Sequence, residues 1–220
     1  MPEKIKIKTD DGMAIAGTYR AMSEQTAPAV VLLHMMPATK ENWDSFAQEL
    51  NKKGFQCLAV DLRGHGESEG GPDGFLNFTD RQHQESIKDV KAAFNFFTAK
   101  GVPPKDIFLC GASIGANLAL KFQAEHPEIR ATILLSPGLN YRGLETEPMA
   151  ERINQTQSVF FAAGGENDRY STETSQNLFN MLKSENKKLK ILKNAGHGTE
   201  IFDDNQSLMG EIILWIQSLN

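Results

Sequence analysis

The serine at position 113 has neighbours whose types and spacing suit a nucleophile. It lies in the stretch IFLCGASIGANLAL, residues 107–120, where an apolar run ends and a segment with helical spacing begins. Gly111 and Gly115 stand two residues before and two residues after it. Glycine weakens a helix by roughly 1 kcal/mol, so its presence on both sides needs another reason. A sharp turn from strand to helix supplies one, because the crossing backbones leave room only for small residues and expose the central side chain.

A serine hydroxyl is a weak nucleophile, so we looked for a histidine to act as its general base. Of the five histidines, only His197 sits on a glycine-flanked loop, KNAGHGTE, directly after the last apolar run. The other four fall at a strand end, in a turn or on helical stretches: His34, His65, His83 and His126. His197 is therefore the predicted base.

The acid that orients such a histidine should follow a strand between the serine and the histidine in the chain. The stretch FFAAGGENDRY places Glu166 and Asp168 directly after an apolar run, and we favour Asp168. Glu166, Asp203, Asp204 and a site without a third member remain alternatives. The predicted catalytic order is serine, then acid, then histidine.

The elements that must position these residues follow from the hydrophobic pattern. Residues 3–9, EKIKIKT, alternate between apolar and charged, and a DDG turn leads to a second strand near 13–21, which predicts an antiparallel hairpin at a sheet edge. Later strands are apolar on both faces: 27–34, 55–62, 106–112, 131–137, 158–164 and 188–194. Segments with helical period separate them: 41–53, 79–100, 114–126, 171–185 and 206–219. The alternation predicts an α/β domain over residues 1–220, with a mostly parallel sheet of about eight strands and helices on both faces.

Composition excludes several classes of protein. The 220 residues are 40% hydrophobic and 23% charged, with a net charge of −5, which is ordinary for a globular chain. Acids and bases are mixed along the length, so we expect neither a nucleic-acid surface nor a membrane surface. Cys57 and Cys110 lie inside apolar runs and are interpreted as core thiols. The N-terminus has no signal-peptide pattern, and we expect a cytoplasmic protein.

Four stretches together resemble the α/β-hydrolase superfamily. GASIG matches its nucleophile elbow, DLRGHGES (61–68) resembles the turn after an early strand, and GGENDRY and NAGHG resemble the segments that carry the acid and the histidine. The resemblance covers nearly the whole chain and is nearest to compact serine carboxylesterases, including cinnamoyl esterases and monoacylglycerol lipases. It implies hydrolysis of an acyl ester by water through an acyl-enzyme intermediate. Neither a metal nor a cofactor is expected, since no histidine pair has ligand spacing.

The resemblance also extends, with one departure, to the segment that binds the oxyanion. LLHMMPATKENW (32–43) is similar to the H-G-x-x-G segment of the family, which implies that the backbone N–H groups of Met36 and Ile114 bind the oxyanion. Met35 stands where the first glycine is usual and Ala38 where the second often is. A backbone with positive φ at position 35 would be strained by a methionine.

Many members of the superfamily carry a large cap between two late strands. Here that connection, residues 138–157, is long enough only for one short helix and some loop. We therefore expect an open mouth with an apolar rim formed by Met35, Leu139, Tyr141, Met149 and Tyr170, suited to small or medium carboxylic esters. A thioesterase, a dienelactone-type or carbon–carbon hydrolase, a peptidase and a non-catalytic binding module are the alternatives on the same scaffold. The sequence does not indicate an oligomeric state.

Overall fold

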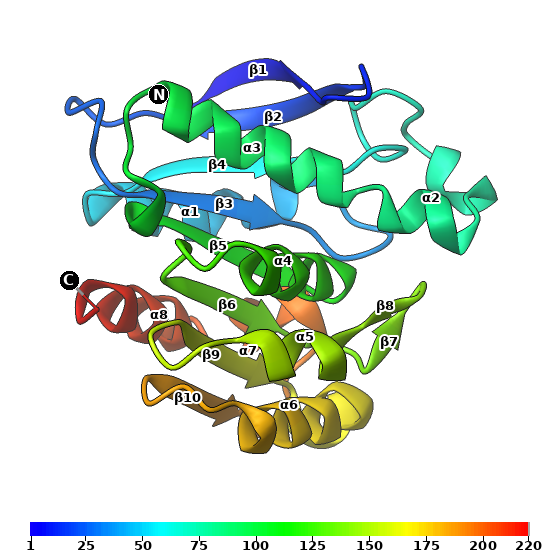
Figure 1. Cartoon of the computed structure of the whole chain (residues 1–220), viewed down its shortest axis with the longest axis vertical. Helices are drawn as coiled ribbons and strands as arrows, with labels where there is room; N and C mark the ends of the chain where they lie inside the picture. The colour runs from blue at the N-terminus through cyan, green and yellow to red at the C-terminus, as the bar shows by residue number, and fades with distance from the viewer. Residues whose placement is uncertain (220) are drawn as a thin grey trace.

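One sheet of eight strands runs through the centre of the molecule, in the order β1-β2-β4-β3-β5-β6-β9-β10 (Figure 1). The structure, a computed structural model, describes residues 1–219. The strands of this sheet are β1 (Glu3–Lys8), β2 (Ala14–Arg20), β3 (Ala29–Leu33), β4 (Gln56–Val60), β5 (Ile107–Ala112), β6 (Ala131–Leu135), β9 (Ser158–Ala163) and β10 (Lys187–Ile191). The α/β fold with a central sheet, predicted from the sequence, is confirmed.

The pairing separates an antiparallel margin from a parallel centre. β1 pairs with β2 and β2 with β4 in antiparallel register, and every neighbouring pair from β4 to β10 is parallel. β1 lies at the edge of the sheet with alternate side chains exposed, as its alternating sequence predicts. The carboxyl ends of all the parallel strands therefore meet at one edge, where loops from distant parts of the chain come together.

Helices cover both faces of the sheet because the central strands are apolar on both sides. On β3, Val31 belongs to one buried cluster and Val30 and Leu32 to another on the opposite face. The first cluster includes side chains of α3 (Ile87–Ala99), α4 (Ile114–Glu125), α5 (Thr146–Arg152) and α6 (Arg169–Met181). The second includes side chains of α7 (Ile201–Asp204) and α8 (Ser207–Gln217), and of α1 (Asp44–Lys52).

Two helical regions differ from the sequence-based expectation. The segment 79–100 is divided into α2 (Asp80–Gln84) and α3, with a turn at residues 85–86. Thr79 caps α2 by accepting a hydrogen bond from the backbone N–H of Gln82. Residues 138–157 contain the expected short helix, α5, and also a hairpin of β7 (Asn140–Tyr141) and β8 (Leu144–Glu145) that the sequence analysis did not predict. This hairpin lies beyond the carboxyl ends of the parallel strands (Figure 1).

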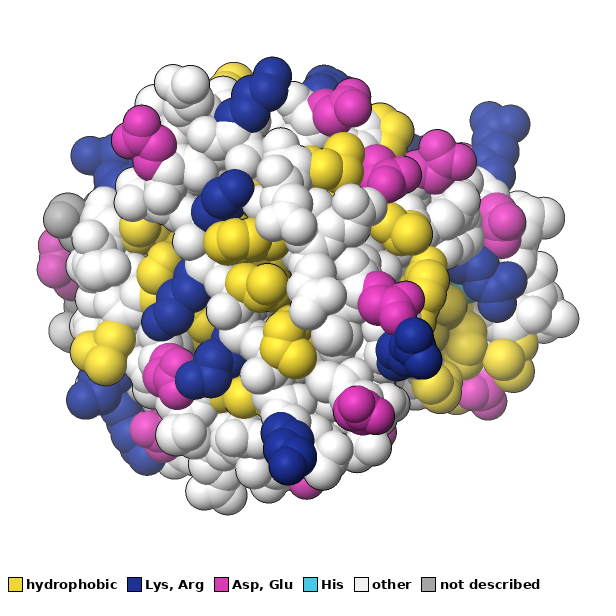
Figure 2. All heavy atoms as spheres, turned by 90° about the horizontal axis from the view of Figure 1, so that it is seen from below, with side chains coloured by type: hydrophobic (Ala, Val, Ile, Leu, Met, Phe, Trp, Pro, Cys, Tyr) yellow, Lys and Arg dark blue, Asp and Glu magenta, His cyan; other side chains and the backbone are white. Residues whose placement is uncertain are grey.

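The surface seen from the β10 side carries acidic and basic side chains interspersed around small apolar patches (Figure 2). The charge on this face is therefore mixed and has no single sign. In residues 1–219, no helix combines the length and the apolar character that crossing a membrane would require.

Candidate active site

Ser113 occupies the sharp turn between β5 and α4. Its backbone has φ 53° and ψ −118°, in a region that residues with a side chain rarely adopt. A Cβ atom on Gly111 would lie 2.1 Å from the carbonyl oxygen of Gly115, and one on Gly115 would lie 2.4 Å from that of Leu33. Both positions therefore admit only glycine, which explains the spacing of the two glycines around the serine.

His197 and Asp168 meet at the same edge of the sheet. The Nδ1 atom of His197, in the loop after β10, lies 3.0 Å from Oδ1 of Asp168, which follows β9. Asp168 is 8% exposed, whereas the alternative acids Glu166, Asp203 and Asp204 all lie on the surface. The structure thus brings Asp168, and none of these alternatives, to the imidazole. Since the carboxylate accepts from Nδ1, the other ring nitrogen is left to act as a base.

Asp168 stays ionised despite its burial. Burial raises the pKa of this carboxyl group, but the hydrogen bond from His197 helps to bring the pKa below its ordinary value. Ser136 follows β6, and its hydroxyl accepts a hydrogen bond of 2.8 Å from the backbone N–H of Gly198. Sequence analysis missed Ser136, although it ends an apolar strand at the same edge as the other site residues.

The loop that carries His197 packs against the end of β5. The backbone N–H of Ser113 donates to the carbonyl of Leu135 at 2.9 Å, next to the Ser136 hydroxyl that holds Gly198. A Cβ atom on Gly198 would lie 3.4 Å from the Cβ of Ala112. The neighbours of Ser113 and His197 are therefore in contact, and both are fixed to the end of β6.

The segment expected to bind an oxyanion is ordered by a buried histidine. His34 Nδ1 lies 2.8 Å from the carbonyl oxygen of Met35, and its Nε2 accepts a hydrogen bond of 2.9 Å from the backbone N–H of Leu62. The ring is therefore a neutral imidazole with its proton on Nδ1, and burial lowers its pKa to about 3. Met35 does not have a positive φ, so the strain anticipated at this position is absent. Its side chain is 8% exposed and packs against Gly198.

The two predicted oxyanion donors lie at the ends of adjacent strands. Ile114 is the first residue of α4, where backbone N–H groups have no partner within the helix, and its side chain is buried. Met36 follows β3 and is half-buried. β3 and β5 are paired, with Leu33 opposite Gly111, so both N–H groups belong to the same edge.

The expected rim residues lie mainly on the 138–157 segment and at the start of α6. Tyr141 and Met149 are half-buried and pack on the core, and Tyr170 is 48% exposed. The rings of Tyr141 and Tyr170 meet edge to face with 5.9 Å between their centroids. Leu139 lines a surface hollow of about 470 Å³ whose other lining residues include three glutamates, Glu145, Glu147 and Glu151. The rim is therefore more acidic on its outer side than the sequence analysis expected.

The sheet order and the serine turn together define an α/β-hydrolase. The chain belongs to the family whose model carries the description "Serine aminopeptidase, S33", which matches residues 24–163. This confirms the family resemblance inferred from the motifs.

Curated relatives and solved structures agree with this assignment. The chain is 26% identical over 138 residues to the quorum-quenching protein AidA of Acinetobacter baumannii, covering 62% of this chain and 44% of AidA. It is 32% identical over 116 residues to monoacylglycerol lipase abhd6-B of Xenopus laevis, covering 52% and 32%. The match spans less than half the length of each of these relatives. The esterase Pf2001 of Pyrococcus furiosus has the same fold, with a TM-score of 0.82 and 18% identity over 100% of this chain and 91% of that one.

Proposed function

We propose that this chain is a serine hydrolase that cleaves small to medium carboxylic esters through an acyl-enzyme intermediate. The observation that carries the proposal is the contact of 3.0 Å between His197 and Asp168 beside a serine held on a strained turn. An esterase of the same fold and a monoacylglycerol lipase among the relatives support an ester substrate. We also propose that the chain is one domain in which residues 138–157 serve as a small cap.

In the proposed mechanism, His197 takes the proton of Ser113 and Oγ attacks the carbonyl carbon of the ester. Asp168 orients the imidazole and stabilises its charged form. The N–H groups of Met36 and Ile114 bind the oxyanion. The alcohol then leaves with the proton from His197, and water releases the acyl group by the same route. The rim residues Met35, Leu139, Tyr141, Met149 and Tyr170 contact the acyl chain or the alcohol.

A series of p-nitrophenyl esters of increasing acyl length tests this function. Wild type should hydrolyse the short and medium esters, and Ser113→Ala should lower kcat by about 10⁶. Ser45→Ala is the matched control, because its hydroxyl lies on the exposed side of α1. Equal rates from wild type and Ser113→Ala would favour a non-catalytic binding module.

Other acyl bonds are tested beside the esters, because they use the same three residues. The family description favours an aminopeptidase as the second candidate. A panel of ester, thioester and aminoacyl p-nitroanilide substrates separates these reactions. Higher kcat/KM on the anilides than on the esters would replace the ester proposal by a peptidase.

A further inference from the structure

The loop that carries His197 is fastened to the centre of the sheet by a serine hydroxyl. The backbone N–H of Gly198, the residue after His197, donates to Oγ of Ser136 at 2.8 Å, although the two residues are 62 positions apart in the chain. The N–H of Gly196, on the other side of His197, donates to the carboxylate of Asp204 at 2.9 Å, within the same stretch of chain. Ser136 thus fixes the residue next to the imidazole to the end of β6.

Residues 135 and 136 also bind the segments that carry the other two proposed catalytic residues. The carbonyl oxygen of Leu135 accepts the backbone N–H of Ser113 at 2.9 Å. The N–H of Ser136 donates to the carbonyl oxygen of Ala162 at 2.8 Å, on the strand that leads to Asp168. The end of β6 therefore makes a hydrogen bond to each of the three segments.

The backbone of Ser136 adopts a conformation that a glycine would adopt with less strain. Its φ is 51°, in the left-handed region, and its side chain is fully buried. Such strain persists in a folded protein where the surrounding contacts over-determine it, and it clusters at functional sites. A glycine here would relieve the strain but would lack the hydroxyl that binds Gly198. The hydrogen bond from Gly198 therefore gives a reason for a side chain at this position.

We propose that Ser136 is a positioning residue: its hydroxyl holds the loop of His197 so that the imidazole stays within reach of the Ser113 hydroxyl. This role rests on the proposed serine hydrolase function. Asp168 fixes the ring through Nδ1, and Ser136 fixes the main chain one residue further on. Without the Ser136 hydroxyl, the buried N–H of Gly198 would lose its acceptor, and the loop would shift to satisfy it. A displacement of about 1 Å at a reacting group can lower a rate by about 10².

Ser136→Ala and Ser136→Gly test this role on p-nitrophenyl butyrate and with a fluorophosphonate that labels active serines. Both variants remove the acceptor, and Ser136→Gly also relieves the strained backbone, so the pair separates the hydroxyl from the conformation. Because the relieved strain offsets the lost hydrogen bond, Ser136→Gly should stay folded. We expect kcat to fall by about 10² in both variants, while KM stays within about twofold. The rate at which folded protein is labelled at Ser113 should fall by a similar factor.

Ser68→Ala is the matched control. The Ser68 hydroxyl is also buried and also accepts a backbone N–H at 2.8 Å, that of Ala16 on β2, outside the proposed site. Its removal should leave kcat and the labelling rate unchanged.

Three results would overturn the role of Ser136 and leave the proposed function intact. Wild-type kcat in Ser136→Gly would do so even if Ser136→Ala were slow, because the hydroxyl would then be dispensable. So would a loss confined to unfolded protein, with the folded fraction labelled at the wild-type rate, and so would an equal loss in Ser68→Ala. A wild type that neither hydrolyses esters nor is labelled would overturn the proposed function, and the role of Ser136 with it.

Discussion

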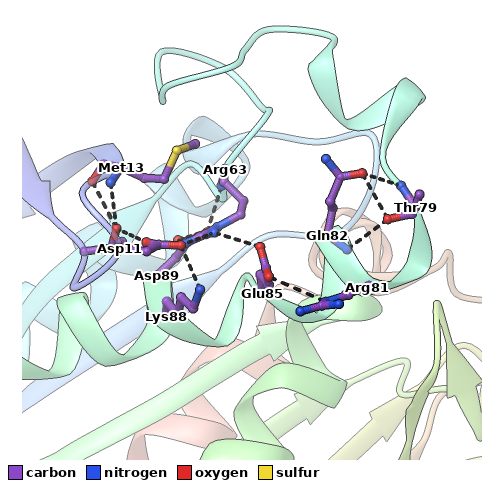
Figure 3. Close-up of polar contacts among 10 residues, drawn as sticks. Asp11, Met13, Arg63, Thr79, Arg81, Gln82, Glu85, Lys88 and Asp89 are labelled. Atoms are coloured by element: carbon purple, nitrogen blue, oxygen red, sulfur yellow. Dashed lines mark hydrogen bonds and ion pairs between the residues drawn. The ribbon is translucent and has the colours of Figure 1, made fainter.

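The two sides of the candidate site are held together by different interactions. On the side of β3 and β4, buried charges are paired: Lys40 Nζ lies 2.7 Å from Asp61 and 2.8 Å from both Glu41 and Glu67. Arg63 contacts Asp89 at 2.8 Å and Asp11 at 2.9 Å (Figure 3). These ion pairs join the segment after β3 and the turn after β4 to the rest of the fold.

On the side of β9 and β10, the two loops that carry Asp168 and His197 meet through close main-chain contacts and a side-chain hydrogen bond. A Cβ atom on Gly164 would lie 2.2 Å from the carbonyl oxygen of Ala195, so the two loops touch through their main chains. The Asn167 side chain donates to the carbonyl of Asn194 at 2.9 Å. The hydrogen-bonded pair of Asp168 and His197 lies on this side as well.

Under the proposed function, the ion pairs around Lys40 hold loops in position, whereas Asp168 and His197 take part in the reaction. A lysine that contacts three carboxylates is held strongly in its protonated form, so it has no proton to exchange at neutral pH. An imidazole with one carboxylate on Nδ1 keeps its second nitrogen to accept a proton from a hydroxyl group. Four substitutions test this contrast, from the largest expected effect to the smallest.

Asp168→Asn should produce the largest effect, on catalysis. The amide would donate to His197 where the carboxylate accepts, so the ring would present the wrong tautomer to Ser113. We expect kcat to fall by about 10⁴ with little loss of thermal stability. Glu166→Gln, at an exposed position three residues after the end of β9, is the control and should retain wild-type kcat. Equal losses in the two variants would exclude Asp168 as the acid.

Lys40→Met should produce the largest effect on stability. The substitution leaves the buried carboxylate of Asp61 without its cation, which costs about 3–5 kcal/mol of unfolding free energy. Lys4→Met removes an exposed contact with Glu67 and should cost much less, because solvent screens the charges of an exposed ion pair. Urea denaturation of both variants measures the difference. Similar costs would show that the buried ion pair is no more important than the surface pair.

Gly164→Ala tests the side of β9 and β10, where two main chains are in close contact. The added methyl group would meet the main chain of Ala195 and Gly196, which cannot yield as a flexible side chain does. We expect a loss of about 3 kcal/mol in unfolding free energy, together with reduced kcat because the two loops carry Asp168 and His197. Gly210→Ala, on α8 with no atom within 4 Å of the new methyl group, should instead stabilise by about 1 kcal/mol. A stable and fully active Gly164→Ala would refute the close contact.

His34→Gln should change the pH dependence of stability. The pKa of His34 is about 3 in the folded protein and near 6.5 when unfolded, so the unfolded chain binds the extra proton between these values. The unfolding free energy therefore falls as pH decreases, by about 2 kcal/mol between pH 7 and pH 5 from this residue alone. The curve for His34→Gln should be shallower by that amount. Parallel curves would show that His34 has the same pKa in the folded and unfolded chain, and would contradict the effect of burial.

The sequence can predict residues whose structural setting depends on a single short stretch of the chain. The turn at Ser113 follows from the two glycines around it, because their effect needs only a strand, a helix and their crossing. His197 was found by its place after the last strand. Glu166 and Asp168 both follow β9, and the sequence analysis favours Asp168 while leaving Glu166 as an alternative. The structure separates them by burial, because Asp168 lies at the start of α6 and faces the loop after β10.

Contacts between segments far apart in the sequence could not be predicted from local patterns. The Lys40 and Asp61 pair joins residues 21 positions apart, and nothing in either local pattern indicates a buried ion pair. The β7–β8 hairpin depends on Arg142 and Gly143, which both have positive φ, and on Asn117 from α4. Gly143 indicates a turn from the local sequence. Asn117, whose side chain binds both ends of the hairpin, lies on an earlier helix.

The tether formed by Asn117, which donates to the carbonyl oxygens of Gly138 and Leu144 at 2.9 Å, has a consequence for how molecules enter and leave. Swinging the hairpin away as a hinged flap would break the hydrogen bonds that a buried amide makes at both of its ends, so we expect the hairpin to stay in place. A molecule that reaches the proposed site would then have to fit the opening as it stands, apart from rotations of surface side chains. Replacing residues at the tip, 142 and 143, would reshape that opening while leaving its anchorage in place.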